Sequence, residues 1–396
     1  MNSKERVRRA LAHKPVDRVP IGFFAIDFDT VERLLGHETY LRAKAKSQIA
    51  FWEGRRDEVV QSWKEDTIAL YKKLDFIDIV NVSAMASSVA PPRDYEPERV
   101  RKVGENTWAA DDGRVWKYSD ITADLTLVAQ PEPSYTLENF PMDEEPAPPD
   151  PSVFEAVDAI IAALGDDRYI LGPSGGEAGM VMLGGMEHGL LMYAMAPDVV
   201  ARAIAYSTRM ANLRDAHYIR TGSDGVLWGT DFAATTGPFI SPRMFGEFCL
   251  PSIQERVQAV KTHGLAVLKH ACGNNWKLLD MFVAAGYDAY QSIQASAGME
   301  LAKVKAKVGD KMALWGGVRV ENLVSGTPYD VRRDVEAALA TMAPPDGAGG
   351  GFILGTTHSV AVGTKYDNFM AMLDAYWALA AQTASTASKA STDYTD

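Results

Sequence analysis

The chain has 396 residues, a formal net charge of −12 at pH 7 and 47% hydrophobic residues. A chain this acidic, whose lysines and arginines are scattered, is not expected to bind nucleic acid. Two cysteines and the lack of any apolar run near about 18 residues predict a cytoplasmic protein with no disulfide framework and no membrane span.

The N-terminal part is predicted to contain an amphipathic helix, a short apolar strand, a long helical stretch and a second strand. In chain order these occupy residues 3–13, the region around residue 21, 30–73 and 74–81. Asn2 or Ser3 caps the first helix and Pro15 stops it.

The pattern changes between residues 96 and 128, where short β-rich runs flank an Asp112-Gly113 turn. This is typical of hairpins and predicts a small antiparallel insertion. A loop rich in proline and glutamate follows at 130–151.

From residue 152 onward, helical and strand patterns alternate regularly. Helices are predicted at 152–165, 180–195, 197–221, 242–262, 276–285, 299–308, 328–342 and 365–382, and strands at 168–173, 225–231, 265–271, 288–291, 312–317 and 351–355. Alternation without an antiparallel interruption indicates a parallel sheet. With the two early strands the total is near eight, which favours a closed barrel over an open sheet.

The predicted fold class is therefore α/β: a (β/α)8 TIM-type barrel with a helical N-terminal extension and a small antiparallel β insertion. We expect one domain over residues 1–382. The tail 383–396 is rich in serine, threonine and alanine and is predicted to be disordered.

The most informative feature is the pair His270 and Cys272 at the end of the predicted strand 265–271. Residues two apart on a strand share a face, so an imidazole and a thiol point the same way. Such a pair is half of a zinc site, although an isolated pair of this kind also occurs in packed cores.

The barrel prediction favours the zinc site over a packed core pair, because catalytic groups of such barrels lie at the carboxyl ends of the strands. The polar residues that end or follow the predicted strands are Asp27, Glu177, Asp231, His270, Cys272, Gln291, Arg319 and His358. Histidines at the ends of two separate strands favour metal binding over core packing.

Several stretches, in their order and spacing, resemble the uroporphyrinogen decarboxylase superfamily over almost the whole chain up to about residue 382. They are 14–20, 231 with 237–242, 270–274, 315–317, 326–330 and 350–354. The resemblance implies a barrel enzyme.

The superfamily has two branches. True uroporphyrinogen decarboxylases use no metal and carry an arginine-rich element near the N-terminus that grips substrate carboxylates, whereas residues 21–27 of this chain contain no arginine. The other branch comprises zinc methyltransferases that work with a corrinoid protein and a thiol such as coenzyme M. They carry His-x-Cys and a later cysteine ten residues before an asparagine of the last helix. The first two match His270 and Cys272, and the position ten before Asn368 is His358.

The resemblance thus implies zinc on His270, Cys272 and His358, with an imidazole replacing the family's last thiolate. Glu177, and second Asp231, are the candidates for a fourth ligand. Two imidazoles and one thiolate leave the metal more electrophilic than a thiolate-rich site, so the acceptor, or even the reaction, can differ from the thiol methyltransferases.

Other strand-end residues have a functional and a structural interpretation. Asp231, Glu177 and Asp27 are candidate catalytic carboxylates, and alternatively they cap or stabilise loops and helices. Arg319 could bind an anionic substrate or form a surface ion pair. Asn274 could orient substrate or cap helix 276–285.

Three hypotheses follow. The first is a zinc-dependent methyltransferase or demethylase that acts on a small substrate with a corrinoid carried by a separate partner protein. The second is a decarboxylase-type lyase for a carboxylated small molecule, with Asp27 or Asp231 as proton donor. The third is a binding protein that kept the barrel without catalysis, which the polar strand-end set disfavours.

Overall fold

The computed structural model describes residues 1–87, 89–342 and 350–392. Its centre is a parallel sheet in the order β1-β6-β7-β10-β11-β12-β13, which keeps the strands in chain order. The strands are β1 (Ile79–Asn81), β6 (Tyr169–Leu171), β7 (Gly225–Trp228), β10 (Ala266–His270), β11 (Ala289–Ser292), β12 (Ala313–Val318) and β13 (Phe352–Thr356).

An extended segment around Ile21 closes this sheet between its two outer strands. Ile21 bridges Leu354 of β13 in parallel, and Gly22 N–H donates to the Leu354 carbonyl at 3.0 Å. On the other side Asp78 N–H donates to the Ile21 carbonyl at 2.9 Å. The predicted (β/α)8 barrel is therefore confirmed, with the extended segment around residue 21 in the place of an eighth strand.

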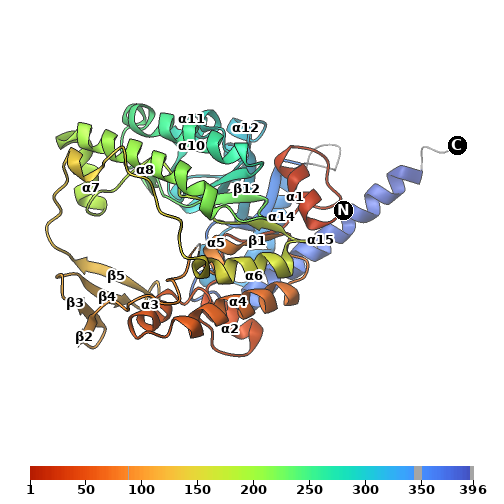
Figure 1. The fold of residues 1–396 in the computed structure, drawn as a ribbon. Helices are drawn as coiled ribbons and strands as arrows, with labels where there is room; N and C mark the ends of the chain where they lie inside the picture. The colour runs from red at the N-terminus through yellow and green to blue at the C-terminus, as the bar shows by residue number, and fades with distance from the viewer. Residues whose placement is uncertain (88, 343–349, 393–396) are drawn as a thin grey trace.

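Helices cover the outside of the barrel (Figure 1). The longer ones are α4 (Arg56–Lys73), α6 (Glu155–Leu164), α7 (Met186–Met195), α8 (Pro197–Tyr218), α10 (Leu250–Thr262), α14 (Pro328–Met342) and α15 (Tyr366–Thr392). Shorter helices are α2 (Phe28–Leu35), α3 (Lys44–Trp52), α5 (Val82–Met85), α9 (Pro242–Met244), α11 (Leu279–Ala285), α12 (Leu301–Val308) and α13 (Val320–Val324). A π-helical turn at Phe245–Cys249 joins α9 to α10, and 3-10 turns occupy Leu137–Asn139, Pro151–Phe154, Trp276–Leu278 and Ala295–Ala297.

The predicted helix 180–195 begins late, at Met186. Gly184 and Gly185 just before it have φ values of +73° and +99°. That left-handed backbone is a glycine conformation and cannot continue a helix.

The N-terminal helix α1 (Ser3–Leu11) covers the mouth of the barrel at the amino ends of the strands. Its buried Val7 and Ala10 pack with the inward-facing Ile79, Leu268 and Trp315. Ion pairs at this end, such as Arg6 Nη1 with Asp78 Oδ1 at 2.6 Å, hold the helix in place. The opposite mouth, at the carboxyl ends, is where loops can build a site.

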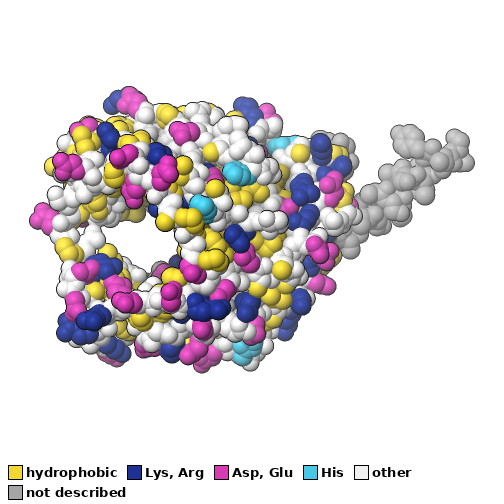
Figure 2. Space-filling view, viewed as in Figure 1, with side chains coloured by type: hydrophobic (Ala, Val, Ile, Leu, Met, Phe, Trp, Pro, Cys, Tyr) yellow, Lys and Arg dark blue, Asp and Glu magenta, His cyan; other side chains and the backbone are white. Residues whose placement is uncertain are grey.

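The predicted insertion is a four-stranded antiparallel meander, β2 (Val100–Gly104), β3 (Thr107–Ala110), β4 (Val115–Ser119) and β5 (Asp124–Ala129). It rests on α3, where Trp52 and Trp116 have ring centroids 5.2 Å apart and Lys44 Nζ lies 3.0 Å from Asp124 Oδ2. Figure 2 shows an opening between this sheet and the body of the barrel.

The C-terminal helix α15 continues to Thr392, which differs from the predicted disordered tail at 383–396. The tail contains several alanines, which have the highest helix propensity, and they allow the helix to extend. Residues 393–396 lie outside the described residues. Among the described helices, none is long and apolar enough to cross a membrane.

Candidate metal centre

Three side chains at the carboxyl ends of β10 and β13 converge on one point. His270, Cys272 and His358 each offer one ligand atom, and these atoms lie within 4.8 Å of one another. The structure thus brings together the three residues that the sequence singled out. Among the described residues, no aspartate or glutamate joins this group.

Strand alternation and a glycine turn place the first two ligands. Leu268 of β10 packs inside the barrel, so His270, two residues on, faces the same way. Gly273 then turns the chain with φ +80°, and a Cβ at this position would lie 2.2 Å from the Ala233 carbonyl oxygen. The turn therefore requires glycine directly after Cys272.

A glutamine orients His270. Its Nδ1 is hydrogen-bonded to Gln291 Oε1, an acceptor, so Nδ1 carries the proton and Nε2 is unprotonated. Gln291 is itself held by donating from Nε2 to the Thr356 carbonyl at 3.0 Å. Burial lowers the pKa of His270 to about 3, which keeps the ring neutral and able to coordinate a metal. Phe24 stacks on this ring with centroids 4.2 Å apart.

The thiol of Cys272 lies 3.3 Å from His270 Nε2 and 3.5 Å from Ser292 Oγ. Burial raises its pKa to about 12. Its own backbone N–H donates to Asp231 Oδ1 at 2.7 Å. Asp231, which the sequence nominated as a catalytic carboxylate, therefore fixes the loop of a candidate ligand, and it remains exposed at the mouth.

His358 follows β13, and its ring centroid lies 5.6 Å from that of His270. Burial lowers its pKa. Its Nδ1 lies 3.0 Å from Ser359 Oγ, which donates to Asp27 Oδ2 at 3.1 Å. Asp27, the third nominated carboxylate, is thus linked to the cluster through one hydroxyl, and Arg42 pairs with it at 2.8 Å.

Glu177 does not reach the cluster. Its carboxylate pairs with the fully buried Lys269 and accepts the Thr230 N–H at 2.9 Å. Lys269 alternates with His270 on β10, so it points out of the barrel into the layer beneath the helices, where Phe232 lies 4.1 Å from its ammonium. A buried ammonium needs a counter-charge, and this demand accounts for the position of Glu177. A lysine within an apolar strand indicates a buried ammonium that needs a nearby carboxylate. This signal from Lys269 was not used to predict the position of Glu177.

The two nominated substrate-binding residues contact neighbouring protein groups. Nε and Nη2 of Arg319 both donate to Asp334 Oδ1 of α14, at 3.0 and 2.7 Å, and the Arg319 side chain is half exposed. Asn274 Oδ1 accepts the Trp276 N–H at 3.2 Å, and Asn275 occupies the N-cap position of the turn at Trp276–Leu278. A role of Arg319 or Asn274 in substrate binding stays a prediction.

The donor set fits a zinc ion. Two neutral imidazoles and a thiol are ligands that Zn²⁺ prefers, and three protein ligands with a free fourth position are typical of catalytic zinc sites. The hydrogen bond from His270 to Gln291 is the kind of outer contact that metal-bound histidines make.

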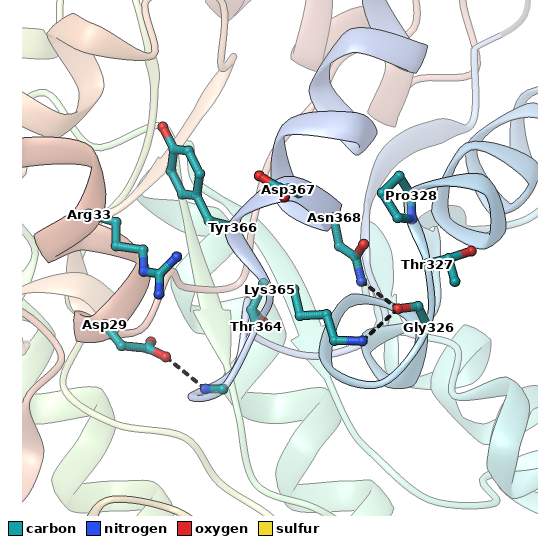
Figure 3. Close-up of a pocket in the computed structure, with 11 residues that line it drawn as sticks. Asp29, Arg33, Gly326, Thr327, Pro328, Thr364, Lys365, Tyr366, Asp367 and Asn368 are labelled. Atoms are coloured by element: carbon teal, nitrogen blue, oxygen red, sulfur yellow. Dashed lines mark hydrogen bonds between the residues drawn. The ribbon is translucent and has the colours of Figure 1, made fainter.

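Two cavities flank the mouth. One of about 330 Å³ lies beside Phe24 and α3. The other, of about 530 Å³, lies between α2 and the start of α15 (Figure 3). In it Asn368 Nδ2 and Lys365 Nζ both donate to the Gly326 carbonyl, at 3.0 and 2.9 Å. Asn368 thereby ties the start of α15, which follows the loop that carries His358, to the end of α13.

Comparisons with known proteins agree with this architecture. A family model described as Uroporphyrinogen decarboxylase (URO-D) matches residues 130–378. A solved methyltransferase from Methanosarcina mazei has 16% sequence identity and a TM-score of 0.64, covering 96% of this chain and 99% of its own. At this identity the likeness shows a shared fold. A D-psicose 3-epimerase from Clostridium cellulolyticum H10 has 12% sequence identity and a TM-score of 0.30, covering 58% of this chain and 83% of its own. This TM-score is too low to indicate a shared fold. No curated protein matches the chain in sequence.

Proposed function

Since the chain belongs to the uroporphyrinogen decarboxylase family, we propose that it is a zinc-dependent methyltransferase of that family. It moves a methyl group between a small methylated substrate or a thiol and a corrinoid held by a separate protein. The observation that carries this proposal is the convergence of His270, Cys272 and His358 within 4.8 Å. A barrel decarboxylase that uses no metal has no need of such a donor set.

The chain's own residues prepare the site. His270 and His358 would hold the ion through neutral rings, and Cys272 through its sulfur. Bound zinc would supply a Lewis acid that lowers the pKa of a coordinated thiol or polarises an oxygen of the substrate. Asp231, exposed beside Cys272, would accept a proton at the mouth, and its hydrogen bond from the Cys272 backbone supports this role. Phe24 covers one face of His270 and excludes water from it.

Exposed apolar side chains beside the opening support a protein partner. Met186, Leu191 and Met195 of α7 are 57%, 54% and 76% exposed, and Leu127 and Val128 of β5 are 41% and 54% exposed. Figure 1 places α7 and β5 on opposite sides of the opening seen in Figure 2. A partner protein that enters this opening would bury apolar side chains on both of its sides.

Metal analysis together with methyl transfer to free cobalamin tests the proposal. The purified protein should contain close to one zinc per chain, and His270→Ala and His358→Ala should lose both zinc and activity. His263→Ala, at an exposed helix end, is the matched control and should keep both. A metal-free protein that releases carbon dioxide from a carboxylated substrate would instead establish the decarboxylase alternative.

A further inference from the structure

The 330 Å³ cavity beside α3, here called the α3 pocket, has the composition of an organic-anion site. Its walls include the rings of Phe24, Phe51 and Trp63 and the cationic side chains of Arg42 and Lys44. None of the lining residues that the structure describes is acidic, although the chain carries a net charge of −12. The volume falls at the lower end of the roughly 300–1,000 Å³ of small-molecule sites.

The pocket adjoins the metal centre through two of its residues. Phe24 is the shared wall, since its ring stacks on His270 with a centroid distance of 4.2 Å. Arg42 reaches the centre along a chain of polar contacts from Asp27 through Ser359 to His358. A ligand in the pocket would therefore lie on the other side of the Phe24 ring from His270, and the three candidate metal ligands do not line the pocket.

Arg42 is built into the pocket rather than free at the surface. Its side chain is 12% exposed and its backbone has φ +62°, a conformation that non-glycine residues rarely adopt. Nε donates to Asp27 Oδ1 at 2.9 Å, Nη2 forms an ion pair with the same oxygen at 2.8 Å, and Nη1 donates to the Ala84 carbonyl at 3.1 Å. A guanidinium has five N–H donors, so two remain for a ligand.

A second, independent observation points to a missing polar partner. Ser83 lines the pocket, and its buried Oγ has no hydrogen-bond partner within the described part of the chain. Buried hydroxyls in folded proteins are nearly always hydrogen-bonded. An oxygen of a bound ligand would satisfy this one.

We propose that the α3 pocket binds a small aromatic carboxylate. Its carboxylate lies on Arg42, with Lys44 at the rim, and its ring lies among Phe24, Phe51 and Trp63. Arginine pairs with carboxylates through paired hydrogen bonds, and aromatic walls favour a flat apolar body. That this molecule is the substrate of the enzyme rests on the proposed methyl transfer. That the α3 pocket binds it does not depend on that function.

Isothermal titration calorimetry of the full chain, with and without zinc, tests the proposal with benzoate as probe. Benzoate should bind in both states, and benzyl alcohol and acetate should bind at least tenfold more weakly. Because zinc-free protein is measured too, a failure of methyl transfer leaves this result standing. Benzyl alcohol or acetate binding as tightly as benzoate, or no benzoate binding at millimolar concentration, would overturn it.

Variants locate the site. Arg42→Met should weaken benzoate binding at least tenfold, while Arg33→Met, an exposed arginine of the other cavity, should leave it unchanged. Since loss of the Asp27 pair could impair folding, Ser83→Val provides a second variant that leaves this pair intact. It replaces the unpaired hydroxyl with apolar methyl groups and should also weaken binding at least tenfold. Unchanged binding in Ser83→Val, or in a folded Arg42→Met protein, would exclude the α3 pocket.

Discussion

His270 and Gln291 are directly paired neighbours on strands β10 and β11, and their side chains meet inside the barrel mouth. The amide oxygen of Gln291 holds the Nδ1 proton of His270, so Nε2 faces Cys272 and the point where a metal would lie. The strand register thus sets the protonation pattern of a candidate ligand.

Gln291→Leu should weaken zinc binding by about 10–100-fold, since outer contacts of metal-bound histidines have effects of that size. Competition with a chromophoric chelator measures the affinity. Gln254→Leu is the matched control, because the exposed Gln254 side chain donates to the Ala284 carbonyl at 2.9 Å, away from the metal centre. Equal zinc affinities in the two variants would show that Gln291 does not support the metal centre.

Zinc binding near pH 7 should release about one proton per ion. Burial lowers the pKa of His270 to about 3 and also lowers that of His358, so neither ring carries an extra proton to lose. Burial raises the pKa of Cys272 to about 12, so its thiol is protonated and must ionise to bind.

Calorimetry in buffers of different ionisation enthalpy counts these protons. Cys272→Ser should release fewer protons than the wild type over the same pH range. Release of two or more by the wild type would contradict the neutral state of the two imidazoles.

His358→Cys should keep the metal and shift activity toward thiol acceptors, because a second thiolate makes the centre less electrophilic. Zinc content and methyl-transfer rates to thiol and non-thiol acceptors are the measurements. Loss of zinc from this variant, with the fold intact by circular dichroism, would count against His358 as a ligand.

Lys269→Met should lower the free energy of unfolding by about 3–5 kcal/mol, because it leaves the Glu177 carboxylate without its buried partner. The double variant Lys269→Met/Glu177→Gln should recover part of this loss, since the amide oxygen still accepts the Thr230 N–H. Urea unfolding measures both.

Zinc content provides the complementary readout for the same pair. Glu177→Gln should retain the full zinc content, because Glu177 binds Lys269 outside the barrel rather than the cluster. Loss of zinc from a folded Glu177→Gln protein would instead support Glu177 as the fourth ligand.

Local periodicity was sufficient to predict the barrel and the shared face of His270 and Cys272, because strand alternation is a property of neighbouring residues. His358 could be nominated because it follows a barrel strand. The direction of Glu177 could not be predicted, since it depends on a buried ammonium contributed by β10. Arg42 was missed because it lies between two helices, α2 and α3, and reaches the mouth only through packing with Asp27.

Helix α1 seals the floor of the barrel, with Val7 and Ala10 inserted among the inward-facing side chains. Under the proposed methyl transfer, donor and acceptor would both have to enter at the opposite mouth, at the carboxyl ends of the strands. They would therefore have to be bound there together, with the smaller reactant deeper in the mouth and the partner protein covering it.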